Sequence, residues 1–100
     1  MNVTIKTEDG LTKAAVEGRV DTTNAEQFIE GLRPLMEIDA ANIEFDCSGL
    51  EYTSSQGLRV FLMLQKAVSA KKGTMVLKEM RPQVKEVFDI TGFSNIIKIL

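Results

Sequence analysis

The chain has no histidine and no tryptophan, and its 100 residues include one cysteine, one tyrosine and two prolines. The absence of histidine excludes Ser-His and Cys-His nucleophile systems and every histidine-based metal site. The single cysteine, Cys47, cannot form an internal disulfide, which favours a reducing compartment. No apolar run approaches the roughly 18 residues of a membrane span. We therefore expect a cytoplasmic protein with no direct membrane insertion, no metal and no cofactor.

The composition that is present suits one small soluble domain. Apolar residues make up 44% of the chain and charged residues 26%, with a formal net charge of −2. This apolar content is enough for one core, and 100 residues is the size of one domain. The longest cationic cluster is the pair Lys71-Lys72, so we expect no nucleic-acid partner. We predict a single domain over residues 1–100 that is a monomer or a weak dimer.

The first part of the chain predicts a hairpin followed by a helix. Apolar and polar residues alternate over residues 3–7 and again over residues 12–17, and Asp9-Gly10 between them is typical of a tight turn. We expect the chain to leave the sheet over Gly18–Asp21. Thr23 and Glu26 fit a capping box that would start a helix near Thr23. Pro34 should bend that helix or end it early.

The second part predicts three further strands separated by two helices. Cys47 lies on the inward face of a strand over residues 42–47. A helix then follows to near Lys72, with Gly73 expected at its left-handed C′ position. The remaining elements are a strand at Met75–Leu77, a helix that begins at Pro82 and ends at Gly92, and a last strand over residues 96–100. This order predicts an α/β fold with a mixed sheet: an opening antiparallel hairpin, then parallel βαβ units with helices packed on the sheet.

The stretch from Asp46 to Arg59 joins the third strand to the second helix. Three consecutive hydroxyls, Thr53, Ser54 and Ser55, stand where the first helical N–H groups lack partners. Thr53 and Gln56 fit a capping box, which needs only one of these hydroxyls. A spare serine at this position can be a further cap, a nucleophile or a phosphate acceptor. The helical face that carries Val60, Phe61 and Leu64 is wide enough for Met63, at its margin, to contact a neighbouring helix or a partner.

This stretch resembles the signature of the STAS domain family, of the anti-sigma factor antagonist type. The matching residues are Asp46-Cys47-Ser48-Gly49-Leu50-Glu51-Tyr52-Thr53-Ser54-Ser55-Gln56-Gly57-Leu58-Arg59. Gly18–Asp21 is also similar to the family's turn after the second strand, and Phe88–Phe93 resembles its third helix. Ser54 stands where many members have aspartate. Members usually add a fourth helix after the last strand, and we expect this fold to lack it.

The resemblance implies a phosphorylation-switched binding module in transcription regulation. Its unphosphorylated form would bind an anti-sigma factor that is a serine kinase and so free a sigma factor, and a serine phosphatase would restore that form. Ser55 is the implied phosphoacceptor and Ser54 the alternative. The residues that we expect at the partner surface are Asp21, Asp46, Ser54, Ser55, Gln56, Gly57, Arg59 and Met63.

Plainer interpretations of three of these residues stay open at this point. Gly57 can serve tight packing of the helix on the sheet, Asp46 can stabilise its turn, and Asp21 can start the first helix. A phosphoacceptor role for Asp46, as in response-regulator receivers, is disfavoured because Lys98 lies inside the last strand and not at its carboxyl end. Two other functions also remain: an accessory subunit of a lipid or anion transport system, and a sensory module for a small ligand. Without a histidine base, a nucleophile elbow or a P-loop, we expect no enzyme activity.

Overall fold

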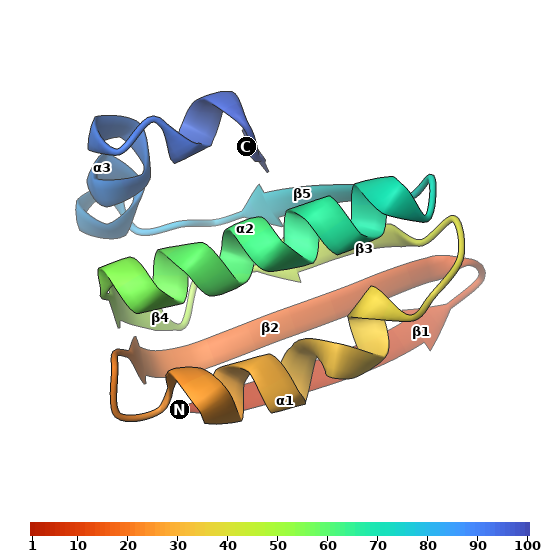
Figure 1. Ribbon diagram of the computed structural model, residues 1–100, viewed down its shortest axis with the longest axis horizontal. Coiled ribbons are helices and arrows are strands. Elements are labelled where there is room, and N and C mark those ends of the chain that lie inside the picture. The colour runs from red at the N-terminus through yellow and green to blue at the C-terminus, as the bar shows by residue number, and fades with distance from the viewer.

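The computed structural model describes residues 1–100, which form one mixed sheet with helices on it (Figure 1). The elements are β1 (Asn2–Glu8), β2 (Leu11–Val20), α1 (Ala25–Met36), β3 (Asn42–Asp46), β4 (Leu50–Thr53), α2 (Ser55–Ala70), β5 (Thr74–Lys78), α3 (Pro82–Ile90), a short 3₁₀ helix (Phe93–Asn95) and β6 (Lys98–Ile99). The strand order is β1-β2-β3-β5-β6, and β4 pairs with β2. Only the β1–β2 pair is antiparallel. The predicted α/β fold is therefore confirmed, and no helix follows β6 within these residues.

The opening hairpin is as predicted. Glu8 pairs with Leu11, and the two residues between them, Asp9 and Gly10, have φ values of 49° and 81°. Two positive φ values define the type I′ turn, whose twist matches that of the flanking strands. The alternating residues of β2 then bury one face, because Thr12, Ala14 and Val16 point to the core while Lys13 and Glu17 are exposed.

The second strand continues further than the sequence predicted. Residues 12–15 of β2 pair with β3, and residues 18–20 pair with β4, with a register shift between Gly18 and Arg19. Gly18 has a φ of 95°, so it takes up the irregularity within the strand instead of ending it. The predicted departure from the sheet at Gly18–Asp21 is therefore wrong, since the strand ends at Val20. Strand β4 was not predicted from the sequence, and its four residues lie inside the stretch that joins β3 to α2.

Helices α1 and α2 lie side by side on one face of the sheet and run in the same direction (Figure 1). The ring of Phe61 on α2 is central to the core. It makes edge-to-face contacts with Phe28 of α1 and Phe45 of β3, with ring centres 5.3 Å apart in both cases, and with Phe88 of α3 at 5.6 Å. All four rings are fully buried. One side chain of α2 thus links both other helices and the central strand, which fixes α2 on the sheet.

Cys47 lies on the inward face, as predicted, and is fully buried. Burial raises the pKa of its thiol from 9.0 to about 12, and the nearby Asp46 carboxylate adds to the rise. A thiol with so high a pKa carries almost no thiolate near neutral pH and is chemically inert. Cys47 is therefore a small core residue.

The C-terminal ends of the helices follow the prediction in part. Helix α2 ends in a Schellman motif, in which Lys72 N–H donates to Ser69 O and Gly73 N–H donates to Val68 O. The left-handed residue is Lys72, with a φ of 62°, so the prediction that Gly73 takes this position is wrong. Gly73 is required one residue later, because a Cβ there would lie 2.6 Å from Ala41 O.

The remaining helix ends and the last strand follow the prediction in part. Helix α3 begins at Pro82 and is followed by left-handed Gly92, as predicted. Pro34 lies in the last turn of α1, which ends two residues later at Met36. The predicted strand over residues 96–100 is reduced to Lys98–Ile99 because a 3₁₀ helix precedes it.

Candidate functional site: the N-terminus of α2 and the groove beside it

The first turn of α2 is fixed by Ser54. Its backbone N–H donates to Val20 O at 2.9 Å, and its hydroxyl oxygen accepts from Gly57 N–H at 3.4 Å. Ser54 is therefore the N-cap, although the second bond is long and the cap is correspondingly weak. The predicted capping box of Thr53 and Gln56 is wrong. Thr53 is buried at the end of β4, where its hydroxyl donates to Ser54 O.

Ser55 is the first residue of α2, and its side chain is exposed. Its hydroxyl takes part in none of the hydrogen bonds that hold this turn, whereas that of half-buried Ser54 does. Two serines that are neighbours in the sequence thus differ in the structure, since one hydroxyl is used by the fold and the other is free. Both lie at the exposed start of the second helix, as the sequence predicted.

Asp21 lies at the same end of the sheet. It directly follows Val20, the last residue of β2, and the Ser54–Val20 hydrogen bond joins that end of β2 to the start of α2. Its carboxylate accepts hydrogen bonds from the hydroxyl and the backbone N–H of Thr23, and these bonds hold the pKa of Asp21 below its usual value. Asp21 therefore carries a full negative charge at neutral pH.

The start of α1 differs from its prediction. The helix begins at Ala25, and the capping box of Thr23 and Glu26 is wrong, because the Thr23 hydroxyl bonds to Asp21. Asn24 precedes the helix without capping it. Its side chain instead accepts from Asp21 N–H and donates to Arg19 O, which closes the loop between β2 and α1.

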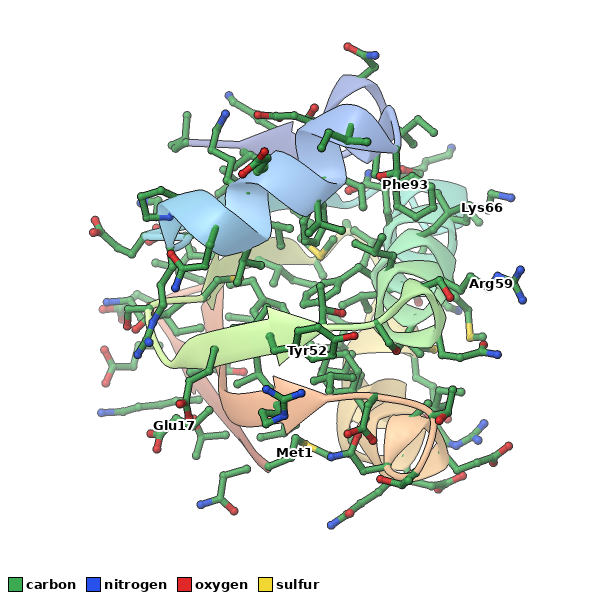
Figure 2. All side chains as sticks on the ribbon, turned by 90° about the vertical axis from the view of Figure 1, so that its left-hand side faces the viewer. Met1, Glu17, Tyr52, Arg59, Lys66 and Phe93 are labelled. Atoms are coloured by element: carbon green, nitrogen blue, oxygen red, sulfur yellow. The ribbon has the colours of Figure 1, made fainter.

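A groove of about 340 Å³ runs between α1 and α2 next to this turn. Three residues expected at the partner surface line it from α2, namely Gln56, Arg59 and Met63. Its other lining residues are Thr22, Ala25, Glu26, Ile29 and Val60. The Met63 side chain is 43% exposed, which is unusual for a large apolar residue on a helix that otherwise buries its apolar face. In Figure 2, Arg59 projects from α2 on the side away from Tyr52 and the strands.

Helix α1 contributes a wall of this groove that was not predicted from the sequence. Ala25 and Ile29 are four residues apart, so they lie on one side of α1, and both are half-buried. The signals that predicted this helix, a start near Thr23 and a bend or end at Pro34, do not show which of its sides borders α2. A second missed feature is Arg19, whose guanidinium lies 4.3 Å from the centre of the exposed Tyr52 ring. This cation–π contact depends on the β2–β4 pairing.

Two of the predicted surface residues are not part of this surface: Gly57 because it is buried, and Asp46 because it lies further along the sheet. Gly57 is buried, and a Cβ at this position would overlap Thr53 Oγ1 and approach Val20 Cγ1 to 2.9 Å. Gly57 thus serves the packing of α2 on the sheet. Asp46 accepts from Ser48 N–H at 2.8 Å and so stabilises its own turn. It pairs with Ala15, five residues before Val20 on β2, which places it about 16 Å from the start of α2.

The candidate site therefore consists of Ser54, Ser55 and Asp21 at one end of the sheet and the adjoining groove with Gln56, Arg59 and Met63. No cluster of acidic or cysteine side chains in the structure could hold a metal ion. No helix is both long enough and apolar enough to cross a membrane. The arrangement is an exposed hydroxyl beside a partly apolar groove, which suits recognition of another macromolecule.

Comparison with known proteins identifies the class to which this fold and site belong. The sequence pattern of the STAS domain matches residues 2–100, and the chain belongs to the STAS domain family. It is 36% identical to BtrV of Bordetella bronchiseptica, named as an anti-sigma factor antagonist, over 99% of this chain and 85% of that protein. It is 30% identical to the anti-sigma-B factor antagonist of Bacillus subtilis, over 99% of this chain and 90% of that protein.

Solved structures share the fold at lower identity. A STAS domain protein from Planctomyces limnophilus has a TM-score of 0.86 at 18% identity, with 97% of this chain and 87% of that one covered. The phosphorylated form of SpoIIAA, a Bacillus cell fate determinant, has a TM-score of 0.72 at 17% identity, with 99% and 91% covered. The resemblance to the STAS family inferred from residues 46–59 is thus confirmed over the whole chain.

Proposed function

We propose that this protein is an anti-sigma factor antagonist whose binding is switched by phosphorylation of Ser55. The observation that carries the proposal is that the two serines differ in hydrogen bonding and in exposure. Ser54 caps α2 and is anchored to Val20, whereas the exposed Ser55 hydroxyl is free of such bonds. The two relatives of at least 30% identity that are named as antagonists support the general role.

The unphosphorylated protein binds an anti-sigma factor and so releases a sigma factor. Its contact surface is the start of α2 together with the groove between α1 and α2. The exposed Met63 and the half-buried Ile29 offer apolar area, and Glu26 and Arg59 offer one charge of each sign. A surface with an apolar centre and a polar rim is the usual form of a specific protein interface.

The anti-sigma factor is itself the serine kinase that closes the switch. The γ-phosphoryl group of ATP moves to Ser55 Oγ, ADP leaves, and a base of the kinase takes the hydroxyl proton. The phosphate adds a charge of about −1.5 to −2 and three acceptor oxygens to the contact surface. Like-charge repulsion and desolvation of the phosphate then weaken the complex. A serine phosphatase restores the original form by hydrolysis.

The fold can accept this phosphate without rearranging. Ser55 points to solvent, and the first turn of a helix favours negative charge because its N–H groups lack partners. Ser54 is instead half-buried, and its hydroxyl oxygen already accepts from Gly57 N–H, so it is less accessible to a kinase. We therefore assign Ser55 as the acceptor and Ser54 as the cap. The protein acts in the cytoplasm as a binding module and catalyses no reaction.

Phosphorylation of single-serine variants tests this assignment. The wild type and the Ser55→Ala, Ser54→Ala and doubly substituted variants would each be incubated with ATP and the serine kinase that co-purifies with the wild type. Mass spectrometry should find one phosphate on the wild type and on Ser54→Ala, and none on the other two. Phosphate on Ser55→Ala but not on Ser54→Ala would contradict the assignment. If no variant accepts phosphate, the switch is wrong, and co-purification with transport subunits becomes the next test.

A further inference from the structure

Arg59 is the one arginine of the chain that has no partner. The other three have one each: Arg33 pairs with Glu30 at 2.7 Å, Arg19 stacks on Tyr52, and Arg81 donates to Ser48 O. The Arg59 side chain is exposed and extends into solvent (Figure 2). Glu26 lines the same groove, yet the two form no ion pair. An unpaired guanidinium with five donors is therefore available close to the start of α2.

The position of Arg59 relative to Ser55 is the second observation. Both lie on α2 with four residues from one to the other, so they are neighbours on one side of the helix, with Cβ atoms about 5–6 Å apart. Long helical side chains lean toward the N-terminus of their helix, so the surface that Arg59 covers lies over the turn containing Ser55. The corresponding neighbour of Ser54 is Leu58, which is buried. Only one of the two serines thus has a cation one turn away.

We propose that Arg59 binds the phosphate of phosphorylated Ser55 within the same molecule. Guanidinium and phosphate match in geometry and form paired, charge-assisted hydrogen bonds. This inference rests on the proposed phosphorylation of Ser55 and deepens it. In the unphosphorylated state the guanidinium is free to contact a partner over the groove. In the phosphorylated state it turns toward Ser55, so the modification removes a positive charge from the groove while it adds negative charge beside it.

The proposal also gives a physical reason for choosing between the serines. A phosphate on Ser55 would have both Arg59 and the free N–H groups of the first turn as partners. A phosphate on Ser54 would have no guanidinium one turn away, because the corresponding position is the buried Leu58. Glu26 competes weakly, because a single carboxylate across the groove carries less charge than a phosphate on the same helix face.

The test measures the titration of the phosphate itself. Phosphoserine would be incorporated at position 55 during synthesis, so no kinase is needed, and the ³¹P chemical shift would be followed against pH. The second pKa of phosphoserine is ordinarily about 6. A nearby guanidinium favours the doubly charged form, so this pKa should be about half a unit lower in the wild type than in Arg59→Gln. Arg59→Lys should give an intermediate value, because it keeps the charge and loses the paired geometry.

Lys66 supplies the matched control. It lies two turns beyond Arg59 on the same exposed face of α2, as Figure 2 shows, and it forms no ion pair. Lys66→Gln removes the same charge from the protein but should leave the phosphate pKa within about 0.1 unit of the wild type. Equal phosphate pKa values in the wild type and Arg59→Gln would overturn the proposal. Equal shifts of this pKa in Arg59→Gln and Lys66→Gln would overturn it as well.

The outcome is separable from that of the proposed function. If Arg59 has no effect on the phosphate but phosphorylation still abolishes binding to the anti-sigma factor, the switch stands and the role of Arg59 is wrong. If the phosphate pKa depends on Arg59 but no kinase modifies Ser55, the pairing stands and the proposed function fails.

Discussion

The backbone N–H of Ser54 donates to the carbonyl oxygen of Val20 at 2.9 Å, which joins the start of α2 to the end of β2. Two segments that are far apart in the sequence are thereby held at one end of the sheet. The charged loop at Asp21 and the free hydroxyl of Ser55 become parts of one surface. Because the bond uses backbone atoms only, substitutions of the serine side chains should alter the chemistry of this surface without moving it.

Ser54→Ala and Ser55→Ala should differ in their effect on the free energy of unfolding. Ser54→Ala removes the N-cap and should lower the free energy of unfolding by about 0.5–1 kcal/mol, at the low end of the range for caps because the Ser54–Gly57 bond is long. Ser55→Ala should change it by less than about 0.5 kcal/mol, since alanine is a good helix former. Urea denaturation of both variants measures the difference. Greater destabilisation by Ser55→Ala would show that its hydroxyl is the true cap.

Gly57→Ala should destabilise the protein by about 1–3 kcal/mol. Replacement of a helical glycine by alanine ordinarily stabilises a helix, but here the added methyl would overlap Thr53 Oγ1 and approach Val20 Cγ1 to 2.9 Å. The steric cost should exceed the gain in helix propensity. Gly31→Ala on α1 is the matched control, because its Cβ would lie 3.3 Å from the Val3 side chain. It should shift stability by less than about 1 kcal/mol, and equal effects of the two would refute the packing role of Gly57.

Much of the fold could be predicted because its signals are local. The alternation in β1, β2 and β3, the short apolar run in β5, and the turn and helix-end residues Asp9-Gly10, Pro82 and Gly92 all act within a few residues, and each of these predictions was confirmed. The missed features depend on pairing between distant segments. Nothing near Leu50–Thr53 marks it as a strand, because those residues are ordered by β2 and not by their own pattern.

The candidate site could likewise be predicted only in part. The hydroxyl cluster and the glycine after it indicate where α2 starts, but not which hydroxyl caps it. That choice depends on the end of β4, which buries Thr53 and moves the cap to Ser54. The other end of α2 also depends on a distant segment. A Cβ at position 73 would lie too close to Ala41 O, so this position requires glycine, and Lys72 takes the left-handed position before it. The burial of Gly57 likewise depends on packing against Thr53 and Val20, whereas the local turn of Asp46 was among the interpretations that its residue type allowed.

Cys47 should make stability fall at alkaline pH. The folded thiol has a pKa of about 12 against an ordinary 9.0, so above pH 9.0 the unfolded state loses a proton that the folded state keeps. The free energy of unfolding should therefore fall as the pH rises from 9.0 toward 12. Below pH 9.0 the thiol is protonated in both states, so it adds nothing to the pH dependence of stability. Cys47→Ala should remove this component of the slope. Parallel pH profiles of denaturation for the wild type and the variant would contradict the buried, neutral thiol.

Phe61→Ala should cost about 3–5 kcal/mol, because the ring is fully buried and contacts three other rings. Such a loss is a large part of the stability of a small domain. Phe93→Ala should cost clearly less, since Phe93 is only half-buried at the edge of the core. Thermal denaturation of both variants checks the order. A larger loss for Phe93→Ala would show that α2 is not fixed by the ring cluster.

Ser55→Asp should fold as stably as the wild type, because an acidic residue in the first helical turn is favoured by about 0.3–1 kcal/mol. It should nevertheless bind the anti-sigma factor more weakly, because the partner surface that contacts position 55 normally faces a neutral hydroxyl and would now face a carboxylate. Circular dichroism and calorimetry on the same sample separate the two effects. A variant that is well folded and binds with unchanged affinity would show that charge at this position is not what the partner detects.

The central claim is tested most directly by the affinity of the anti-sigma factor for the protein with and without a phosphate on Ser55. Isothermal titration calorimetry would compare the unphosphorylated chain with the chain carrying phosphoserine at position 55, under the same salt conditions. The account predicts that the phosphate raises the dissociation constant at least tenfold, which corresponds to about 1.4 kcal/mol. Equal dissociation constants for the two forms would contradict it.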